Sequence, residues 1–253
     1  MSPNRVAWVL AIAISGAASP RAYAESTAGS PAAYGPPTDD PAPFSEGPTP
    51  PLASDWAERV ARLELGYRGT FVASSGYDPF STDGYFPAVS LVASRTVFAA
   101  GPWAFAPGIA WDYGRSAATA RGDSTSLKMQ RVTVPLEGRL HFGRWGYLFA
   151  RIAPGAAMER AEVDDPSAPS ALTKSLWLFT GDASAGYALP VLPLPERPGR
   201  AIRVWLQGDF GYSWTPDNAL TLTSNSSQTT DAVALGSLGM RGAFLRFAVA
   251  LSY

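Results

Sequence analysis

Acidic and basic residues of this chain are spaced so that they fall on one face of extended segments, opposite the apolar side chains. Ten of them share this face: Glu64, Arg68, Glu137, Arg139, Arg151, Glu159, Asp182, Arg203, Asp209 and Arg246. In an enclosed space such groups pair with one another, because an unpaired buried charge is very costly. Two kinds of chemistry fit them, a gated ion path or proton relay and a self-neutralising polar plug. We favour the plug.

The sequence offers little for catalysis. His141 is the only histidine, and it lies two residues before a predicted turn at Gly143, with no serine close to it in sequence. Without a base, no serine is an activated nucleophile. The chain has no cysteine, and Asp164-Asp165 is a charged loop pair rather than a cluster of metal ligands. We therefore predict no catalytic residue, no metal site and no cofactor, and we expect that the protein is not an enzyme.

The overall charge excludes nucleic acid as a partner. The chain has 20 basic and 21 acidic residues, a net charge of −1, and no dense basic run. Charged residues make up only 16% of the chain while aromatic residues reach 12%, with 8 tryptophans. Soluble domains are usually nearer ~25% charged. Few charges and many aromatic rings suit a surface that faces lipid.

Residues 1–24 have the pattern of an export signal. Arg5 supplies the positive start, Val6–Ile14 form a short apolar core, and Ala22-Tyr23-Ala24 is a small-x-small cleavage site. No later segment approaches the ~18 apolar residues that a transmembrane helix needs. Residues 25–54 are rich in proline, serine and glycine and cannot bury enough apolar surface to fold. We predict a disordered linker in the periplasm for this segment.

From about residue 55 onward, apolar and polar residues alternate with period two, which is typical of strands that separate two environments. Each segment has about ten residues or more, enough for a tilted strand to cross a bilayer. The segments lie at about residues 63–73, 86–98, 103–113, 132–142, 147–159, 177–189, 202–214 and 245–253. The fold class is therefore all-β. The alternation leaves ten strands open as an alternative, because residues 232–243 could extend the last strand.

Two further patterns indicate a membrane barrel. Short links (99–102, 143–146 and the proline-rich 191–200) alternate with longer ones (74–85, 114–126, 160–174 and 215–243). When the strands are threaded up and down, the outward aromatic residues gather in two belts, as they do at membrane interfaces. Four prolines lie inside predicted strands, where each removes a ladder donor and predicts a bulge or kink. They are Pro87, Pro107, Pro135 and Pro154.

The end of the chain adds a resemblance to a known class. Phe247, Val249, Leu251 and Tyr253 alternate with small or polar residues up to a terminal aromatic ring. This pattern is similar to the assembly signal of bacterial outer-membrane barrels, and residues 55–253 resemble the small barrels of the OmpA and OmpX type. The resemblance implies a closed antiparallel transmembrane β-barrel of eight strands with up-and-down topology. It also implies an integral protein of the Gram-negative outer membrane, surrounded by outer-membrane lipid and lipopolysaccharide and inserted by the barrel-assembly machinery.

Three functions follow from this interpretation. The leading hypothesis is a non-catalytic structural or surface-interaction protein with a charge-filled, largely closed lumen. The alternative is a narrow channel for small solutes or apolar molecules, lined in part by Tyr147, Phe149 and Trp205. The third is a lipid-modifying barrel enzyme. The sequence does not specify a surface partner.

Overall fold

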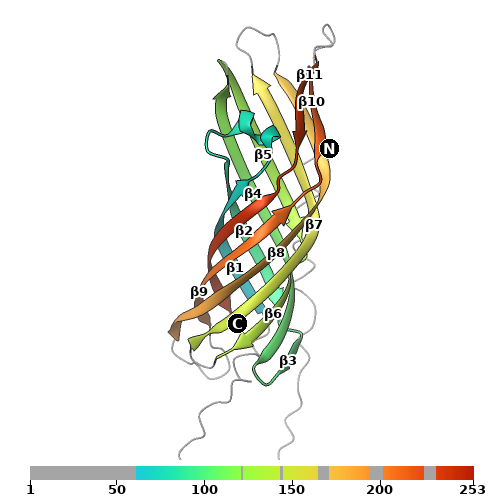
Figure 1. The fold of residues 1–253 in the computed structure, drawn as a ribbon. Coiled ribbons are helices and arrows are strands. Elements are labelled where there is room, and N and C mark those ends of the chain that lie inside the picture. Colours follow the sequence, from blue (N-terminus) through green and yellow to red (C-terminus); the bar gives the residue numbers. More distant parts are fainter. Residues whose placement is uncertain (1–60, 121, 143–144, 165–170, 194–201, 225–231) are drawn as a thin grey trace, which may run out of the picture. The chain divides into compact units, whose positions relative to one another are not determined.

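The computed structural model describes residues 61–253 except 121, 143–144, 165–170, 194–201 and 225–231 (Figure 1). The predicted signal peptide (1–24) and linker (25–54) lie outside the described residues. No helix in the described part of the chain is both long and apolar enough to cross a membrane.

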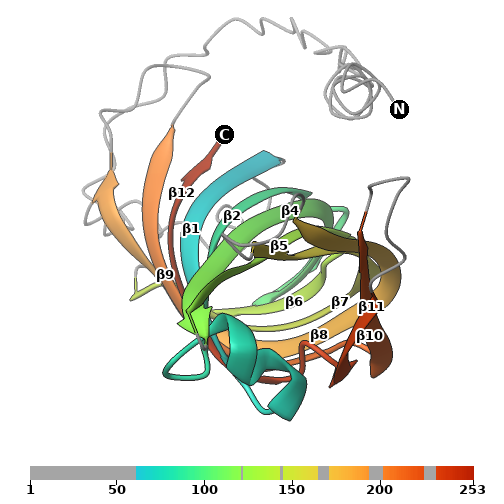
Figure 2. The same cartoon turned by 90° about the horizontal axis from the view of Figure 1, so that it is seen from above.

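Eight strands form a closed ring (Figures 1 and 2). They are β1 (Ala61–Val72), β2 (Tyr85–Arg95), β4 (Trp103–Ala120), β5 (Asp123–Thr133), β7 (Tyr147–Asp164), β8 (Leu172–Pro193), β9 (Arg203–Trp214) and β12 (Gly242–Ser252). Each strand pairs antiparallel with the next one along the chain. β12 then pairs with β1, with Leu251 opposite Leu63. The predicted eight-stranded up-and-down barrel is confirmed.

Four shorter strands complete the sheet without entering the ring as separate members. β3 (Phe98–Ala100) pairs with the start of β4, and β6 (Leu136–His141) continues β5 between β4 and β7. β10 (Asn218–Ser224) and β11 (Ala232–Leu238) form a hairpin in the link between β9 and β12. Most of the region 232–243 therefore belongs to this hairpin and adds no strand to the ring, and the last strand begins at Gly242.

Two of the predicted long links are largely strand. β4 continues to Ala120 and β5 begins at Asp123, so the predicted loop over residues 114–126 is a tight hairpin with Gly122 at a φ of 96°. In the same way, β7 runs to Asp164 and β8 begins at Leu172. The polar composition of these segments favoured loops. In a hairpin, however, the two strands satisfy each other's backbone groups, and a polar face does not prevent their pairing.

Only one of the four strand prolines interrupts a strand. Pro135 falls in the break between β5 and β6, while Pro87 and Pro154 stay inside β2 and β7 in unbroken register. Pro107 stays inside β4, but the pairing of β4 shifts by one residue beside it, from Ser94 opposite Gly108 to Phe98 opposite Phe105. Proline removes an N–H donor but keeps its carbonyl acceptor. Val134 N–H donates to the Pro154 carbonyl at 2.8 Å, for example. The predicted bulge or kink is therefore confirmed beside Pro107, and it was wrong at Pro87 and Pro154.

The barrel is apolar outside and charged inside. Leu65 and Phe210 point outward and are 59% and 61% exposed, whereas Glu64 and Arg68 point inward and are 1% and 3% exposed. A soluble protein distributes these residue types in the opposite way. An apolar outer surface around a polar interior is the arrangement of a barrel that spans a lipid bilayer, so the strands are transmembrane.

The ring is taller on one side, at the end that carries the long links. β2 last pairs with β4 at Gly114, after which β4 continues to Ala120 paired with β5 alone. β5, β7 and β8 continue beside it. We call these outer portions of β4, β5, β7 and β8 the tall wall. The β10–β11 hairpin lies at the same end, with Thr223 of β10 opposite Thr173 of β8 (Figure 1).

Candidate functional site

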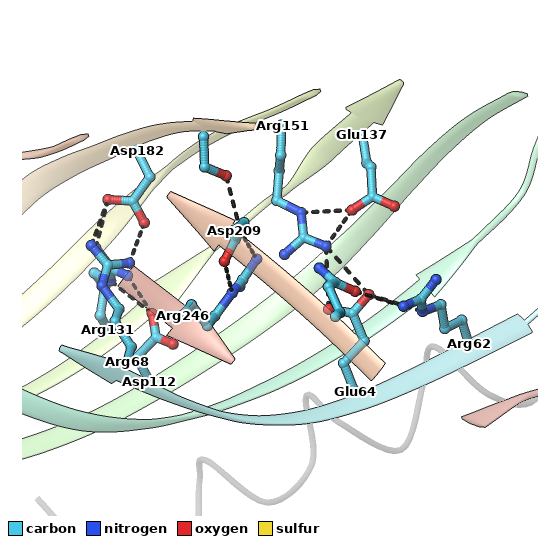
Figure 3. Close-up of polar contacts among 12 residues, drawn as sticks. Arg62, Glu64, Arg68, Asp112, Arg131, Glu137, Arg151, Asp182, Asp209 and Arg246 are labelled. Carbon is cyan, nitrogen blue, oxygen red and sulfur yellow. Dashed lines mark hydrogen bonds and ion pairs between the residues drawn. The ribbon is translucent and has the colours of Figure 1, made fainter. Parts of the chain in front are cut away.

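Five side chains from β1, β6 and β7 form an ion-pair group in the lumen near the short links, which we call the inner cluster. Figure 3 labels four of them: Arg62, Glu64, Glu137 and Arg151. Glu137 accepts hydrogen bonds from Nε of Arg139 at 2.6 Å and from Nε of Arg151 at 2.7 Å. Arg151 also contacts Glu64, with Nη2 3.2 Å from Oε2. Arg62 Nε lies 3.2 Å from the other carboxylate oxygen of Glu64. The inner cluster thus joins three guanidinium groups to two carboxylates.

A second ion pair, the central pair, lies between β9 and β12. Asp209 and Arg246 are opposite each other in the strand register. Arg246 Nε donates to Asp209 Oδ1 at 3.0 Å, and the Ser184 hydroxyl donates to Asp209 Oδ2 at 3.1 Å. Both charged side chains are buried. The pair is therefore neutral and hydrogen-bonded on both carboxylate oxygens.

The third group, the outer cluster, brings together side chains from β1, β4, β5 and β8 (Figure 3). Asp182 accepts from Arg68 Nη1 at 2.6 Å and from Arg131 Nη1 at 2.8 Å. Arg131 Nε also donates to Asp112 at 2.9 Å. The Arg68 guanidinium lies 3.7 Å from the ring centroid of Phe244. Two carboxylates and two guanidinium groups balance each other across four strands.

One small cavity lies among these groups. A cavity bordered by Arg131, Arg151, Asp182 and Arg246 measures about 10 Å³. A cavity of this volume holds about one water molecule. The charges are thus bonded to each other rather than arranged around a water-filled passage, and an ion would have to break several buried pairs to pass.

Aromatic side chains close the lumen at the short-link end. Tyr147 packs against Phe149 and Trp205, with ring centroids 6.1 and 5.3 Å apart. Trp205 Nε1 donates to the Ser252 hydroxyl at 2.9 Å. These are the residues that the channel hypothesis placed along a passage. They are buried against one another instead.

His141 lies beside this aromatic group. Its ring centroid is 4.9 Å from that of Tyr147, and neither ring nitrogen has a hydrogen-bond partner among the described residues. No serine or carboxylate among the described residues is hydrogen-bonded to His141, as the partner of a catalytic base would be. The histidine is also at the end of the barrel opposite the long links.

The other end of the lumen is filled by a second kind of packing, the apolar plug. It includes the short 3-10 helix η2 (Ser75–Phe80) from the first long link and side chains of the β10–β11 hairpin. Its buried members are Tyr77, Phe80, Phe86, Ala88, Leu127, Met129, Ala157, Ala161, Leu220, Leu222, Leu238 and Met240. The plug therefore joins the wall of the barrel to two of its links.

Hydrogen bonds hold η2 in place. The Ser116 hydroxyl donates to the Phe80 carbonyl at 2.6 Å, and the Tyr77 hydroxyl donates to the Tyr85 carbonyl at 2.9 Å. Burial raises the pKa of Tyr77. In the turn that follows, the Ser81 hydroxyl and the Tyr85 N–H donate to Asp83 and lower the pKa of its carboxyl group. The link is thus a folded part of the barrel rather than an open loop.

The structure brings eight of the ten predicted lumen charges into the three groups: Glu64, Arg68, Glu137, Arg139, Arg151, Asp182, Asp209 and Arg246. Glu159 is not among them, and its inclusion in the charge network was wrong. It is buried beside the apolar plug between Met129 and Leu176, and its Oε1 has no hydrogen-bond partner in the described part of the chain. Arg203 is half-buried at the first residue of β9.

Three members of the groups were missed by the predicted network: Arg62, Asp112 and Arg131. Arg62 is two residues before Glu64, and Arg131 is two residues before the inward Thr133. Continuing the period-two alternation toward the strand ends would have found both. Asp112 lies on the polar face of a predicted segment, so the same alternation marks it as an inward charge.

The predicted assembly signal lies on the outward face of β12. Phe247, Val249, Leu251 and Tyr253 are all exposed, while the residues between them point inward. The backbone of β12 pairs with β1 on one side and β9 on the other, so β12 closes the ring. Recognition of this strand by the assembly machinery stays a prediction.

No family model matches the sequence, and no curated protein matches it. Solved structures do match. The major outer membrane protein of Thermus thermophilus is 13% identical, with 76% of this chain and 99% of that chain covered and a TM-score of 0.47. Ail, the attachment invasion locus protein of Yersinia pestis, is 12% identical over 76% of this chain and 97% of its own, with a TM-score of 0.42. The outer membrane protease OmpT of Escherichia coli is 9% identical over 77% and 93%, with a TM-score of 0.39.

The resemblance to small outer-membrane barrels is confirmed for the fold. It rests on the molecule itself, since the ring of eight antiparallel strands, the apolar exterior and the polar interior are all present.

Proposed function

We propose that the protein is a non-catalytic integral protein of the Gram-negative outer membrane, a closed scaffold that presents its long-link end at the cell surface. The filled lumen carries this proposal. Three buried ion-pair groups and an apolar plug occupy it from one end to the other, with a residual cavity of about 10 Å³ at membrane depth. A general pore needs a continuous aqueous path, which this packing does not provide.

The two ends of the barrel support an orientation. Both ends of the ring's chain, Ala61 and Tyr253, lie at the short-link end and are hydrogen-bonded to each other. Barrels of the outer membrane have short turns on the periplasmic side and longer links on the outer side. In this orientation the tall wall, η2 and the β10–β11 hairpin form the exposed part, which would serve envelope integrity or contact with a surface partner.

The position of His141 supports a non-catalytic role. It is the only histidine of the chain, and it is buried at the periplasmic end among aromatic rings. A general base must be within reach of the proton that it abstracts. A lipid-modifying site at the outer face would have to work without this residue.

Conductance is the test of the closed lumen. Residues 25–253 would be refolded, folding would be confirmed by a heat-dependent gel shift, and currents would be recorded in a planar bilayer. We expect a folded barrel without single-channel steps. Steady steps would overturn the scaffold and make transport the function. Failure to fold in detergent would contradict the membrane barrel itself.

The orientation can be tested because the chain has no cysteine of its own. Gly122 and Gly101 form a matched pair: both have positive φ, 96° and 55°, both have open space at the Cβ position, and they lie at opposite ends of the barrel. We expect a membrane-impermeant maleimide to label Gly122→Cys but not Gly101→Cys on intact cells. The reverse pattern would invert the orientation, and equal labelling before and after lysis at both positions would contradict insertion in the outer membrane.

A further inference from the structure

Three basic side chains face outward in a single row across the tall wall. Arg115 of β4 is directly opposite Lys128 of β5, and Lys128 is directly opposite Arg160 of β7. Their alternate neighbours along each strand point into the barrel, while these three are exposed or half-buried on its outer surface. We call them the basic row. Cβ atoms of directly opposed residues in an antiparallel sheet are about 5 Å apart, so the charges are adjacent.

No ion pair among the described residues neutralises this row. None of its three side chains forms an ion pair within the described residues. The nearest acidic residues on the same face are Glu162 and Asp164. They lie two and four residues after Arg160 on β7, farther from the membrane. Like charges directly opposite each other destabilise a sheet. An anion bound over the three bases would relieve this repulsion.

The row lies at a defined depth. On the exterior, the next row of side chains toward the middle of the barrel comes from the same three strands and β8. It consists of Tyr113, Gln130, Met158 and Trp177, which lie opposite one another in register. The exterior row after that, nearer still to the middle of the barrel, continues the aromatic belt with Trp111 and Phe179. The Trp111 ring is stacked on that of Tyr113, with the ring centroids 6.1 Å apart. Aromatic belts lie at the boundary between hydrocarbon and headgroups. The basic row is therefore at the level of the headgroups.

We propose that the basic row is a binding site for the phosphate groups of lipid headgroups in the leaflet at the long-link end. This inference rests on the proposed outer-membrane location, where that leaflet contains phosphorylated glycolipid. Guanidinium and ammonium groups bind phosphate through charge-assisted hydrogen bonds. Three of them side by side match a headgroup with more than one phosphate, while the aromatic belt below contacts its acyl chains. The site holds lipid against the tall wall.

The test uses residues 25–253, refolded in detergent and verified by the heat-dependent gel shift. Bisphosphorylated lipid A, its dephosphorylated form and inorganic phosphate would be titrated separately, and bound lipid would be measured by native mass spectrometry. The variant is R115Q/K128Q/R160Q. Its matched control is R95Q/K174Q, which removes exposed or half-exposed bases at the opposite end of the barrel and at its mouth. We expect binding of bisphosphorylated lipid A to weaken about tenfold or more in the triple variant, and not in the control.

Stability supplies a second readout with an opposite sign. Without lipid A, the triple variant should be at least as resistant to urea as the unmodified protein, because the repulsion between the three bases is removed. With lipid A, only the unmodified protein and the control should gain stability. Equal binding by the triple variant, or equal binding of dephosphorylated lipid A, would overturn the proposal. So would complete displacement of lipid A by low-millimolar phosphate, which would make the row a site for free anions. A barrel that fails the gel shift would contradict the proposed function instead.

Discussion

The lumen at membrane depth and the lumen inside the tall wall are filled by opposite chemistries. At membrane depth, arginine and carboxylate side chains from facing strands neutralise one another across the barrel. Inside the tall wall, Tyr77 and Phe80 of η2 pack with Leu222 and Leu238 of the β10–β11 hairpin in an apolar core. The first filling comes from the wall alone, while the second needs two links to fold inward.

This difference follows from what surrounds each part of the wall. At membrane depth the exterior must be apolar, so the polar residues of each strand point inward and have to be paired there. Beyond the outer aromatic belt the exterior faces headgroups and water rather than hydrocarbon, and it carries residues such as Arg115 and Glu162. There the interior can be an ordinary hydrophobic core, as in a soluble domain. The same sheet is therefore apolar on its outer face at membrane depth and apolar on its inner face beyond the aromatic belt.

The largest effect is expected from breaking the inner cluster. Arg151 contacts both Glu64 and Glu137, so Arg151→Met leaves two buried carboxylates with less compensation. We expect a loss of about 3–5 kcal/mol in the free energy of unfolding, measured by urea titration in lipid vesicles. Arg241→Met is the control, because its pair with Asp217 is 43% and 40% exposed, and such pairs contribute less than about 1 kcal/mol. Equal effects of the two substitutions would show that the lumen ion pairs do not support the barrel.

An effect of similar size, but confined to one part of the molecule, is expected from the apolar plug. Phe80→Ala removes a fully buried ring, a change that costs about 3–5 kcal/mol in a packed core. The plug lies inside the tall wall, past the level where the ring of eight strands is complete. We therefore expect the link over residues 73–84 to open without unfolding of the barrel. Chymotrypsin cleavage after Tyr77 should then rise by roughly a hundredfold or more while the gel shift persists. Phe98→Ala changes an exposed residue at the short-link end and should alter neither the cleavage rate nor the gel shift. If Phe80→Ala unfolded the whole barrel, the apolar plug and the ion-pair groups would form a single cooperative unit.

Glu159 is an ionisable residue in apolar surroundings, and it sharpens the comparison. Its buried Oε1 has no hydrogen-bond partner in the described part of the chain. Replacement of an unpartnered buried polar group by an apolar one of similar size is neutral or stabilising, so Glu159→Met should raise the free energy of unfolding by about 1–3 kcal/mol. Glu162→Met, three residues farther along β7 on the exterior, should change it by less than about 0.5 kcal/mol. Destabilisation by Glu159→Met would mean that this carboxyl group belongs to a polar network after all.

The smallest effect concerns the turn after η2. Hydrogen bonds from Ser81 and Tyr85 lower the pKa of Asp83 below its ordinary value of 3.8, so the turn gains stability from the ionised form. That stability is complete above the ordinary value and is lost as the pH falls through the lowered one. The amide signal of Tyr85, followed by NMR, should therefore titrate below pH 3.8. Ser81→Ala should move the midpoint upward while Thr82→Ala leaves it in place, and identical midpoints in all three proteins would contradict the role of Ser81.

The sequence alone determined the barrel, because the side-chain period of a strand is two and each strand separates lipid from lumen. Alternation of residues such as Leu63, Glu64 and Leu65 was enough to predict eight strands, their facing sides and most of the inward charges. The alternation failed to predict the structure where the exterior of a strand is not in contact with lipid. The hairpin around Gly122 has a polar exterior in water and looks like a loop, and Glu159 has the polar face of its strand but an apolar neighbourhood.

Only the tertiary structure decided which charges meet and where the links go. Arg131 and Asp182 are far apart in the sequence and come from strands that are not neighbours in the ring, so their pairing depends on closure of the barrel. The same closure brings η2 under the β10–β11 hairpin, where Gly76 lies so close to Ser237 that a Cβ atom would come within 2.1 Å of its carbonyl oxygen. Local pattern reports which face a residue occupies. The partner across the lumen is set by the ring's geometry, which no single segment encodes.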